Sequence, residues 1–327
     1  MLTVTLVASF AAAALWQQWR AVEVETAERA RIQSAWVLAG ALDWSRLILR
    51  EDSLARSGDG TDNLTEPWAV PLAEARLSTF LAAQRGVAQA PDASTDTTDA
   101  FLSGQITDQQ ALLNLRNLAQ SGQVDAVALR QFARLFEYLG LPPAQLDAIA
   151  RQMVQALAEP ATPAGGSGGS ASPAPLLPQR VEQLGWWGVP VATVAALAPY
   201  VTLLPMRTKV NLNTADPVVL WASADGLSMA QAQQLVQARA ARHFTGEADA
   251  TRLLGTADGI AAATHTVSSQ YFLVHGQLRL GGAVVRERSL VHKQQGEART
   301  LWRERGAPPV DAGGGAGTYN AAPPPAP

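Results

Sequence analysis

The sequence contains no cysteine, little net charge and few histidines, and each shortage excludes a class of function. Without cysteine the chain has no thiol nucleophile, no disulfide framework and no thiolate metal site. A net charge of −3 gives no basic footprint for nucleic acid, because counterion-driven binding needs clustered lysine and arginine. No two histidines stand at the i, i+4 spacing that places both imidazoles on one metal ion. The four histidines are His243, His265, His275 and His292.

The sequence also lacks a paired acid and base, a phosphate-binding loop and a nucleophile with a partnered base. One hydrolase pattern, G-x-S-x-G, occurs at residues 165–169, inside a stretch over 160–175 made only of Pro, Gly, Ala, Ser and Thr. That motif needs a strand before it and a helix after it, so we interpret the match as chance. The sequence therefore predicts no enzyme and no cofactor, with a flexible linker over 160–175.

The amino-terminal stretch has no charged residue before Arg20 and is membrane-seeking. As a helix, residues 1–16 would reach roughly 24 Å, less than the hydrocarbon core of about 30 Å. No proline or turn cluster interrupts the chain before about residue 51, so we expect one helix over 1–51. The apolar residues that would enter a membrane or a filament core are Leu2, Val4, Leu6, Val7, Phe10, Leu15 and Trp16.

This amino-terminal helix has two alternative interpretations, a truncated signal anchor or a helix buried in a globular core. A signal peptide would carry a basic region before the apolar stretch, and the sequence has none there. The missing basic flank indicates a start codon assigned several residues late. We expect the last third of the helix to pack on a globular domain.

The middle of the chain is predicted to consist of short paired helices. Amphipathic stretches over 123–140 and 142–158 each predict a helix. Three segments share the order Gly, apolar residue, Pro or Ser, any residue, Ala. This order is typical of a turn between helices, because glycine can end a helix in the left-handed conformation. The segments begin at Gly140, Gly188 and Gly226.

The remaining carboxy-terminal part has a different pattern. From residue 266 to about 305, aromatic and β-branched residues alternate with polar ones, which predicts an antiparallel meander. The tail over 306–327 is rich in Pro and Gly and is predicted to be disordered.

Loop carboxylates offer the only visible candidates for a calcium site. Asp59, Asp62 and the aspartates within 92–99 could supply oxygen ligands, but they lack the regular ligand spacing of an EF-hand. We therefore interpret them as solvated side chains.

The most specific string in the sequence is VNLNTADP at residues 210–217. Thr214 is expected to cap a helix whose first turn holds Asp216. With a second helix after Gly226, the segment resembles a helix-hairpin-helix unit, in which amides of a Gly-x-Gly hairpin bind a phosphate. A membrane-tethered DNA-binding protein of the competence type is thus the alternative function, although Ser228 replaces the second glycine. The motif residues are Asn211, Asn213, Thr214, Ala215 and Pro217.

Taken together, these segments make residues 1 to about 305 resemble the general secretion pathway protein K family of minor pseudopilins. The resemblance lies in the long apolar amino-terminal helix and in three strings. They are GQITDQQALLNLRNL at 104–118, LAPYVTLLPMRTKVNLNTADPVVL at 197–220, and SQYFLVHGQLRL at 269–280 followed by TLWRERG at 300–306.

The resemblance implies an α+β fold with a pilin-like domain over 52–113 and 265–305. A large all-α domain, similar to a SAM or helix-hairpin-helix unit, would be inserted over 114–264. Family members are cleaved and amino-methylated after a basic leader, and this chain lacks the leader and its cleavage site. Some relatives bind calcium, but this chain has no carboxylate at 151–155, where those relatives carry them, so calcium is not expected.

The function implied is that of a non-catalytic minor pseudopilin of the type II secretion system. It would cap the pseudopilus tip and help to initiate assembly for the export of folded periplasmic proteins. The implied location is the bacterial inner membrane, crossed once, with the bulk of the chain in the periplasm. The implied partners are the other minor pseudopilins, the major pseudopilin, the inner membrane, and a secreted substrate or the outer-membrane channel, with no nucleic acid among them.

Overall fold

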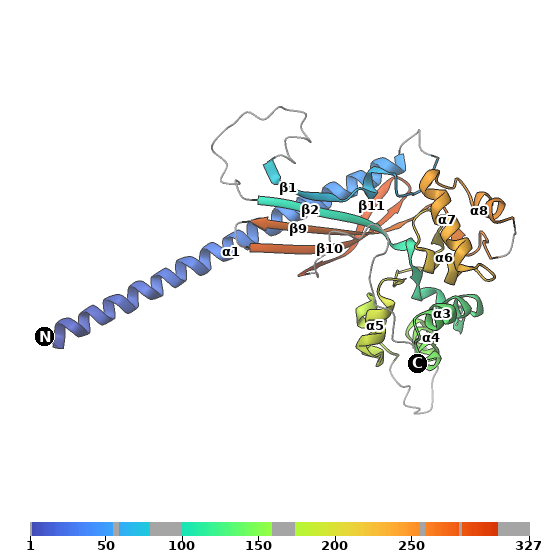
Figure 1. Ribbon diagram of the computed structural model, residues 1–327. Coiled ribbons are helices and arrows are strands. Elements are labelled where there is room, and N and C mark those ends of the chain that lie inside the picture. Colours follow the sequence, from blue (N-terminus) through green and yellow to red (C-terminus); the bar gives the residue numbers. More distant parts are fainter. Residues whose placement is uncertain are drawn as a thin grey trace, which may run out of the picture.

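The longest element is the helix α1 (Leu2–Leu54), which runs across a sheet and extends beyond it as a stem (Figure 1). The computed structural model describes residues 2–54, 59–78, 100–158, 174–255, 259–280 and 283–306. No proline interrupts α1, so its ladder of hydrogen bonds can continue throughout. Leu38, Leu42 and Leu49 recur on one face of its last third and are at most 2 % exposed. The single long helix predicted from the sequence is confirmed.

Five strands form one antiparallel sheet, in the order β1, β2, β9, β10, β11. α1 packs on one face of it, where side chains from the helix meet Trp68, Phe272 and Val291. The α+β class predicted from the sequence, with its small antiparallel sheet, is confirmed. The strands are β1 (Leu72–Arg76), β2 (Ala100–Asp108), β9 (Tyr271–Leu280), β10 (Ala283–Gln294) and β11 (Glu297–Arg305), and the turn η1 (Pro67–Ala69) precedes β1.

α1 lies very close to the sheet at Gly276 of β9, which pairs with Gly104 of β2. A Cβ atom at position 276 would lie only 2.7 Å from Cδ1 of Leu38. Glycine at this position therefore allows the helix to reach the sheet backbone.

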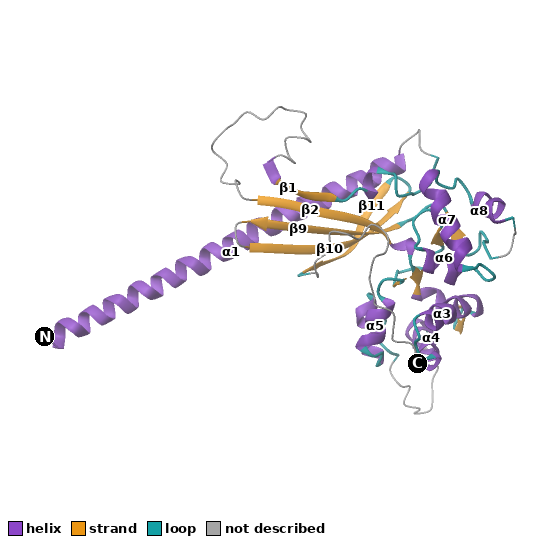
Figure 2. Cartoon of the chain, viewed as in Figure 1, coloured by secondary structure: helices purple, strands orange, loops and turns teal. Residues whose placement is uncertain are grey.

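Between β2 and β9 the chain folds into a mainly helical insertion beyond one end of the sheet (Figure 2). Its own core, which includes Phe132, Phe136 and Leu235, is a cluster distinct from those under α1. The helices are α3 (Ala126–Tyr138), α4 (Pro143–Leu157), α5 (Val191–Leu197), α6 (Pro217–Ser223), α7 (Met229–Ala241) and α8 (Glu247–Leu254). Short elements connect them: η2 (Gln109–Ala111), β3 (Leu113–Asn114), η3 (Leu115–Leu118), β4 (Ala119–Gln120), β5 (Gln123–Val124), η4 (Val181–Trp187), β6 (Val201–Thr202), β7 (Val210–Asn211) and β8 (His265–Thr266).

The three glycine turns predicted from the repeated pattern all lie between helical elements. Gly140 separates α3 from α4, Gly188 separates η4 from α5, and Gly226 separates α6 from α7. Their φ angles are +65°, +78° and +83°, the left-handed region that favours glycine. This part of the prediction is confirmed.

Several predicted features fall on parts of the chain outside the described residues. They are the linker over 160–175 up to residue 173, the aspartates within 92–99, and the tail beyond residue 306. Among the described helices, none combines enough length with enough apolar character to cross a membrane. The predicted single-pass span stays a prediction.

Candidate functional site

The motif at 210–217 meets the end of β2 in a buried group of polar side chains, called the polar junction below. It comprises Asp62, Asp108, Asn211, Thr214 and Ser269. Asn211 is fully buried at the end of β7, and its Nδ2 group reaches three acceptors. These are the Asp62 carbonyl oxygen at 3.0 Å, Oδ2 of Asp108 at 3.1 Å and Oγ of Ser269 at 2.9 Å. One side chain of the motif thus binds the loop after α1, strand β2 and the segment before β9.

Asp108 is the centre of the polar junction. Its Oδ2 atom also accepts hydrogen bonds from the hydroxyls of Thr214 and Ser269, both at 2.6 Å, and its Oδ1 atom accepts one from the Gln110 amide at 2.7 Å. Burial raises the pKa of Asp108, and these donors oppose that rise. A buried carboxylate is stable here because several donors surround it.

Asn213 connects the motif to the far side of the insertion. Its Nδ2 group donates to the Phe244 carbonyl at 2.9 Å, and its Oδ1 atom accepts from the Phe244 amide at 2.8 Å. Asn213 and Phe244 therefore form a two-bond bridge between the motif and the chain after α7. Ala215 is buried in the helical core beside it.

The predicted helix cap at Thr214 is wrong. The residue that caps α6 is Asp216, whose carboxylate accepts a hydrogen bond from the Val218 amide at 3.0 Å. Pro217 is the first residue of α6, where a missing amide proton costs little. Thr214 lies two residues before this cap and donates its hydroxyl to Asp108 instead.

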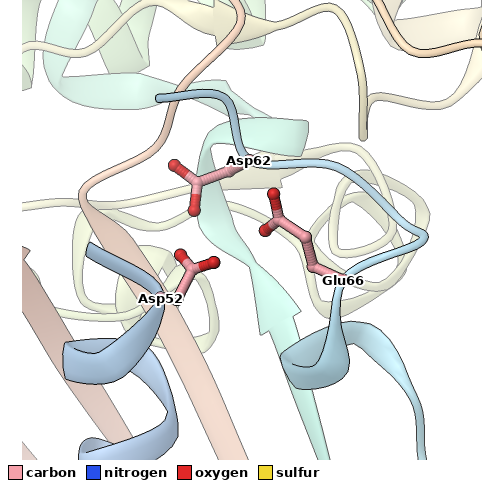
Figure 3. Close-up of side chains that lie close together, drawn as sticks. All are labelled: Asp52, Asp62 and Glu66. Atoms are coloured by element: carbon pink, nitrogen blue, oxygen red, sulfur yellow. The ribbon is translucent and has the colours of Figure 1, made fainter. Parts of the chain in front are cut away.

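A group of three carboxylates, Asp52, Asp62 and Glu66, shares Asp62 with the polar junction, and its oxygen atoms lie within 4.8 Å of one another (Figure 3). The interpretation of Asp62 as a solvated side chain is wrong, because Asp62 is buried. Its Oδ2 atom accepts a hydrogen bond from the Ser269 amide at 2.7 Å, and its own amide donates to Val267. Loop composition suggests solvation, but this loop packs between α1 and the insertion.

Lys293 of β10 places its ammonium group against this carboxylate group. Its Nζ atom is 2.8 Å from Oδ2 of Asp52 and also donates to Oδ1 of Asp62. Burial works against the charged lysine, but the two carboxylates raise its pKa. Burial raises the pKa of Asp62 to about 6, with Lys293 opposing, and raises that of Glu66 to about 7. These residues do not fit a calcium ion, because an ammonium group already bonds two of the three carboxylates.

Asp59 stays at the surface, as predicted, but is paired. Its carboxylate accepts hydrogen bonds from the hydroxyl of Thr61 at 2.7 Å and lies 2.6 Å from Nε2 of His243. These bonds lower the pKa of Asp59 to about 2. The pair adds a second link between the loop after α1 and the insertion.

A third link joins the insertion to the outer strands of the sheet. Arg288 of β10 lies 3.0 Å from Glu182 of η4 and 2.6 Å from Glu304 of β11. Arg180 also pairs with Glu304. The side chain of Arg288 is mostly buried, so screening by solvent is weaker than at a fully exposed pair.

The hairpin at 226–228 is not arranged to bind a phosphate. The Ser228 amide, which such a hairpin would offer to a ligand, donates to Oε1 of Gln231 at 2.9 Å. The carboxylate of Asp225 stands beside the turn, paired with Arg130 at 3.1 Å. Arg134 donates to the Leu227 carbonyl at 2.9 Å. These cations are therefore occupied by protein acceptors, and the geometry gives no support to the DNA-binding alternative.

Two family descriptions match this chain, and both read type II secretion system, protein K. They cover residues 111–206 and 210–268. Over both regions the chain is similar to the type II secretion system protein K family. The resemblance proposed from the sequence is thereby confirmed. Asn211 and Thr214 of the polar junction lie in the second matched region, whereas its other three residues lie outside both regions.

Two curated members of the protein K family align with most of this chain. The type II secretion system protein K of Pseudomonas aeruginosa is 25% identical over 336 residues, covering 96% of this chain and 94% of that protein. The protein K of Klebsiella pneumoniae is 28% identical over 287 residues, covering 80% and 81%. The first of these alignments therefore spans the stem, the sheet and the insertion.

The fold is also similar to a solved structure. This is the crystal structure of the GspK-GspI-GspJ complex from the enterotoxigenic Escherichia coli Type 2 Secretion System, matched with a TM-score of 0.62. The sequence identity is 20%, and the match covers 86% of this chain and 98% of that one. This similarity shows a shared fold. A protein K chain is a minor pseudopilin, a structural component of the secretion system.

Proposed function

We propose that this protein K chain caps the tip of a pseudopilus and helps to initiate its assembly, for the export of folded periplasmic proteins. The observation that carries the proposal is the exposed apolar surface of α1. Val4, Phe10 and Trp16 are each more than half exposed, which is unusual for large apolar side chains unless a partner or a membrane covers them. The amino-terminal half of α1 would pack in the inner membrane first and in the helical core of the filament afterwards.

The helical insertion supports a position at the tip. It stands beyond one end of the sheet, away from the amino terminus of α1 (Figure 1). A subunit added above this chain would have to occupy the space that the insertion fills. The bulk of the chain would lie in the periplasm, where it could also contact a secreted substrate or the outer-membrane channel.

The other minor pseudopilins are the proposed partners of this chain, together with the major pseudopilin below it. The similar structure from enterotoxigenic Escherichia coli contains GspK together with GspI and GspJ. The proposed role is mechanical, without catalysis or a cofactor, because the two hydroxyls that donate to Asp108 are buried together with it, out of reach of a substrate.

The test is to locate the chain on assembled filaments. An epitope tag would be placed after residue 327 in the full chain, and pseudopili from cells that overproduce the major pseudopilin would be labelled with immunogold. The proposal predicts label at one end of each filament. Label distributed along the sides would contradict it, because a bulky cap cannot be an internal subunit.

A further inference from the structure

Three carboxylates lie together where the carboxy-terminal end of α1 meets the sheet and the insertion (Figure 3). Asp52 belongs to the last turn of α1, whereas Asp62 and Glu66 belong to the loop that follows. Their oxygen atoms lie within 4.8 Å of one another. Carboxylates this close usually need a cation between them, because like charges repel strongly in a buried site.

The cation at this position comes from the chain itself. The Nζ atom of Lys293 bonds Asp52 and Asp62, and the Lys293 side chain is only 9% exposed. The Lys293 amide donates to the Gln270 carbonyl at 2.7 Å, and Nζ lies 5.0 Å from the centre of the Phe272 ring. Both the backbone and the stem of this lysine are therefore fixed in place.

The choice of lysine at this position is informative, because the chain has only two lysines, Lys209 and Lys293, and uses arginine for its other basic residues. An ammonium group is a compact point charge with three donors that can face separate carboxylates. A guanidinium group is larger, and its donors all lie in one plane. The ammonium group of Lys293 therefore places a compact positive charge where a metal ion would otherwise lie.

We propose that the ammonium group of Lys293 is a tethered counter-ion that takes the place of a divalent cation, so that the joint between α1 and the helical insertion is independent of calcium. The joint runs from Asp52 of α1 through Lys293 to Asp62. From Asp62 it continues to Ser269 and Asn211, which belong to the polar junction. This joint would then hold α1 and the insertion together during filament assembly without a bound metal ion.

Removal of the ammonium group should turn this joint into a metal site. The full-length chain, purified in detergent and treated with EDTA, would be melted with and without millimolar Ca²⁺. We expect the wild-type melting temperature not to respond to Ca²⁺. We expect Lys293→Gly to melt roughly 10 °C lower in EDTA, because one partner of a buried ion pair is lost, and to regain most of that loss with Ca²⁺. Lys209→Gly, at the exposed lysine, is the matched control and should show neither effect.

Terbium luminescence provides a second readout at the same place. The indole of Trp68 donates a hydrogen bond to Glu66 and would sensitise a terbium ion held by the three carboxylates. We expect luminescence from Lys293→Gly, and its loss when Trp68→Phe is added. The wild type should give only background luminescence, and the substitution Trp68→Phe should not change it.

Three outcomes would overturn the proposal. They are a wild-type chain that Ca²⁺ stabilises, terbium luminescence from the wild type that needs Trp68, and a Lys293→Gly chain as stable in EDTA as the wild type. If Lys293→Gly does not fold, Lys293→Ala, which also removes the ammonium group, is measured instead. A folded Lys293→Ala chain that Ca²⁺ stabilises supports the tethered counter-ion, and one that does not respond to Ca²⁺ contradicts it.

Discussion

Replacement of Asn211 by alanine tests whether the motif at 210–217 holds the insertion on the sheet. The side chain is fully buried and is bonded to Asp62, Asp108, Ser269 and Asn213. Alanine removes all four contacts and leaves the Asn213 amide and the Asp62 carbonyl buried without this partner. Each buried group left unpaired costs about 1–3 kcal/mol, and hydrogen bonds to carboxylates stand at the upper end of that range.

The expected loss for Asn211→Ala is therefore about 4 kcal/mol of unfolding free energy, after allowance for water that enters the space. Urea unfolding of the purified chain, followed by tryptophan fluorescence, would measure it. Asn211→Asp should lose at least as much, because it places a second carboxylate against Asp108 without leaving a cavity. Gln120→Ala, at an exposed position, is the matched control and should change the free energy by less than about 0.5 kcal/mol. A loss below about 1 kcal/mol for both Asn211 variants would refute the reasoning.

For two further substitutions, the structure predicts the direction of the change in stability. Burial lowers the pKa of His265 to about 4, whereas an unfolded histidine titrates near about 6.5. The neutral histidine therefore stabilises the fold fully above pH 6.5, and this contribution is lost as the pH falls toward 4. At pH 5 the loss of unfolding free energy from this histidine is about 2 kcal/mol relative to pH 7. His265→Gln should lack this loss, whereas the control His243→Gln should retain it. Urea unfolding at both pH values measures the difference. Gly276→Ala should destabilise the chain by about 1–3 kcal/mol, because its Cβ would lie 2.7 Å from Leu38. Gly40→Ala lies on α1, where a Cβ atom would meet nothing within 4 Å, and should instead stabilise the chain by up to about 1 kcal/mol. Urea unfolding measures both, and equal effects at the two glycines would contradict the packing described here.

Local patterns were sufficient to predict the stem, the meander and the glycine turns. Each depends on residues close together in the sequence: an uninterrupted run for α1, alternation for β9 to β11, and the left-handed glycine for the helix ends. The cap at Thr214 shows where local reasoning stops. Thr214 and Asp216 are both good caps, and the choice between them depends on Asp108, which binds the threonine hydroxyl from a distant strand.

The buried charges could not be predicted from the sequence. Asp62 lies in a polar loop and looks solvated, yet its partners Lys293 and Ser269 come from the other end of the chain. Nothing in the local sequence around Asp108 marks it as the centre of four hydrogen bonds. Only the pairing of β2 with β9 brings these groups together, because that pairing returns the chain to the sheet after the whole insertion.

The most direct test of the central claim is to identify what the full chain binds. The tagged full-length protein would be purified in detergent from membranes of cells that produce the complete secretion system, with duplex DNA offered in parallel at low and high salt. The account predicts that other minor pseudopilins co-purify with it and that DNA is not retained. Salt-sensitive retention of DNA, with no pseudopilin recovered, would contradict the account and favour the helix-hairpin-helix alternative.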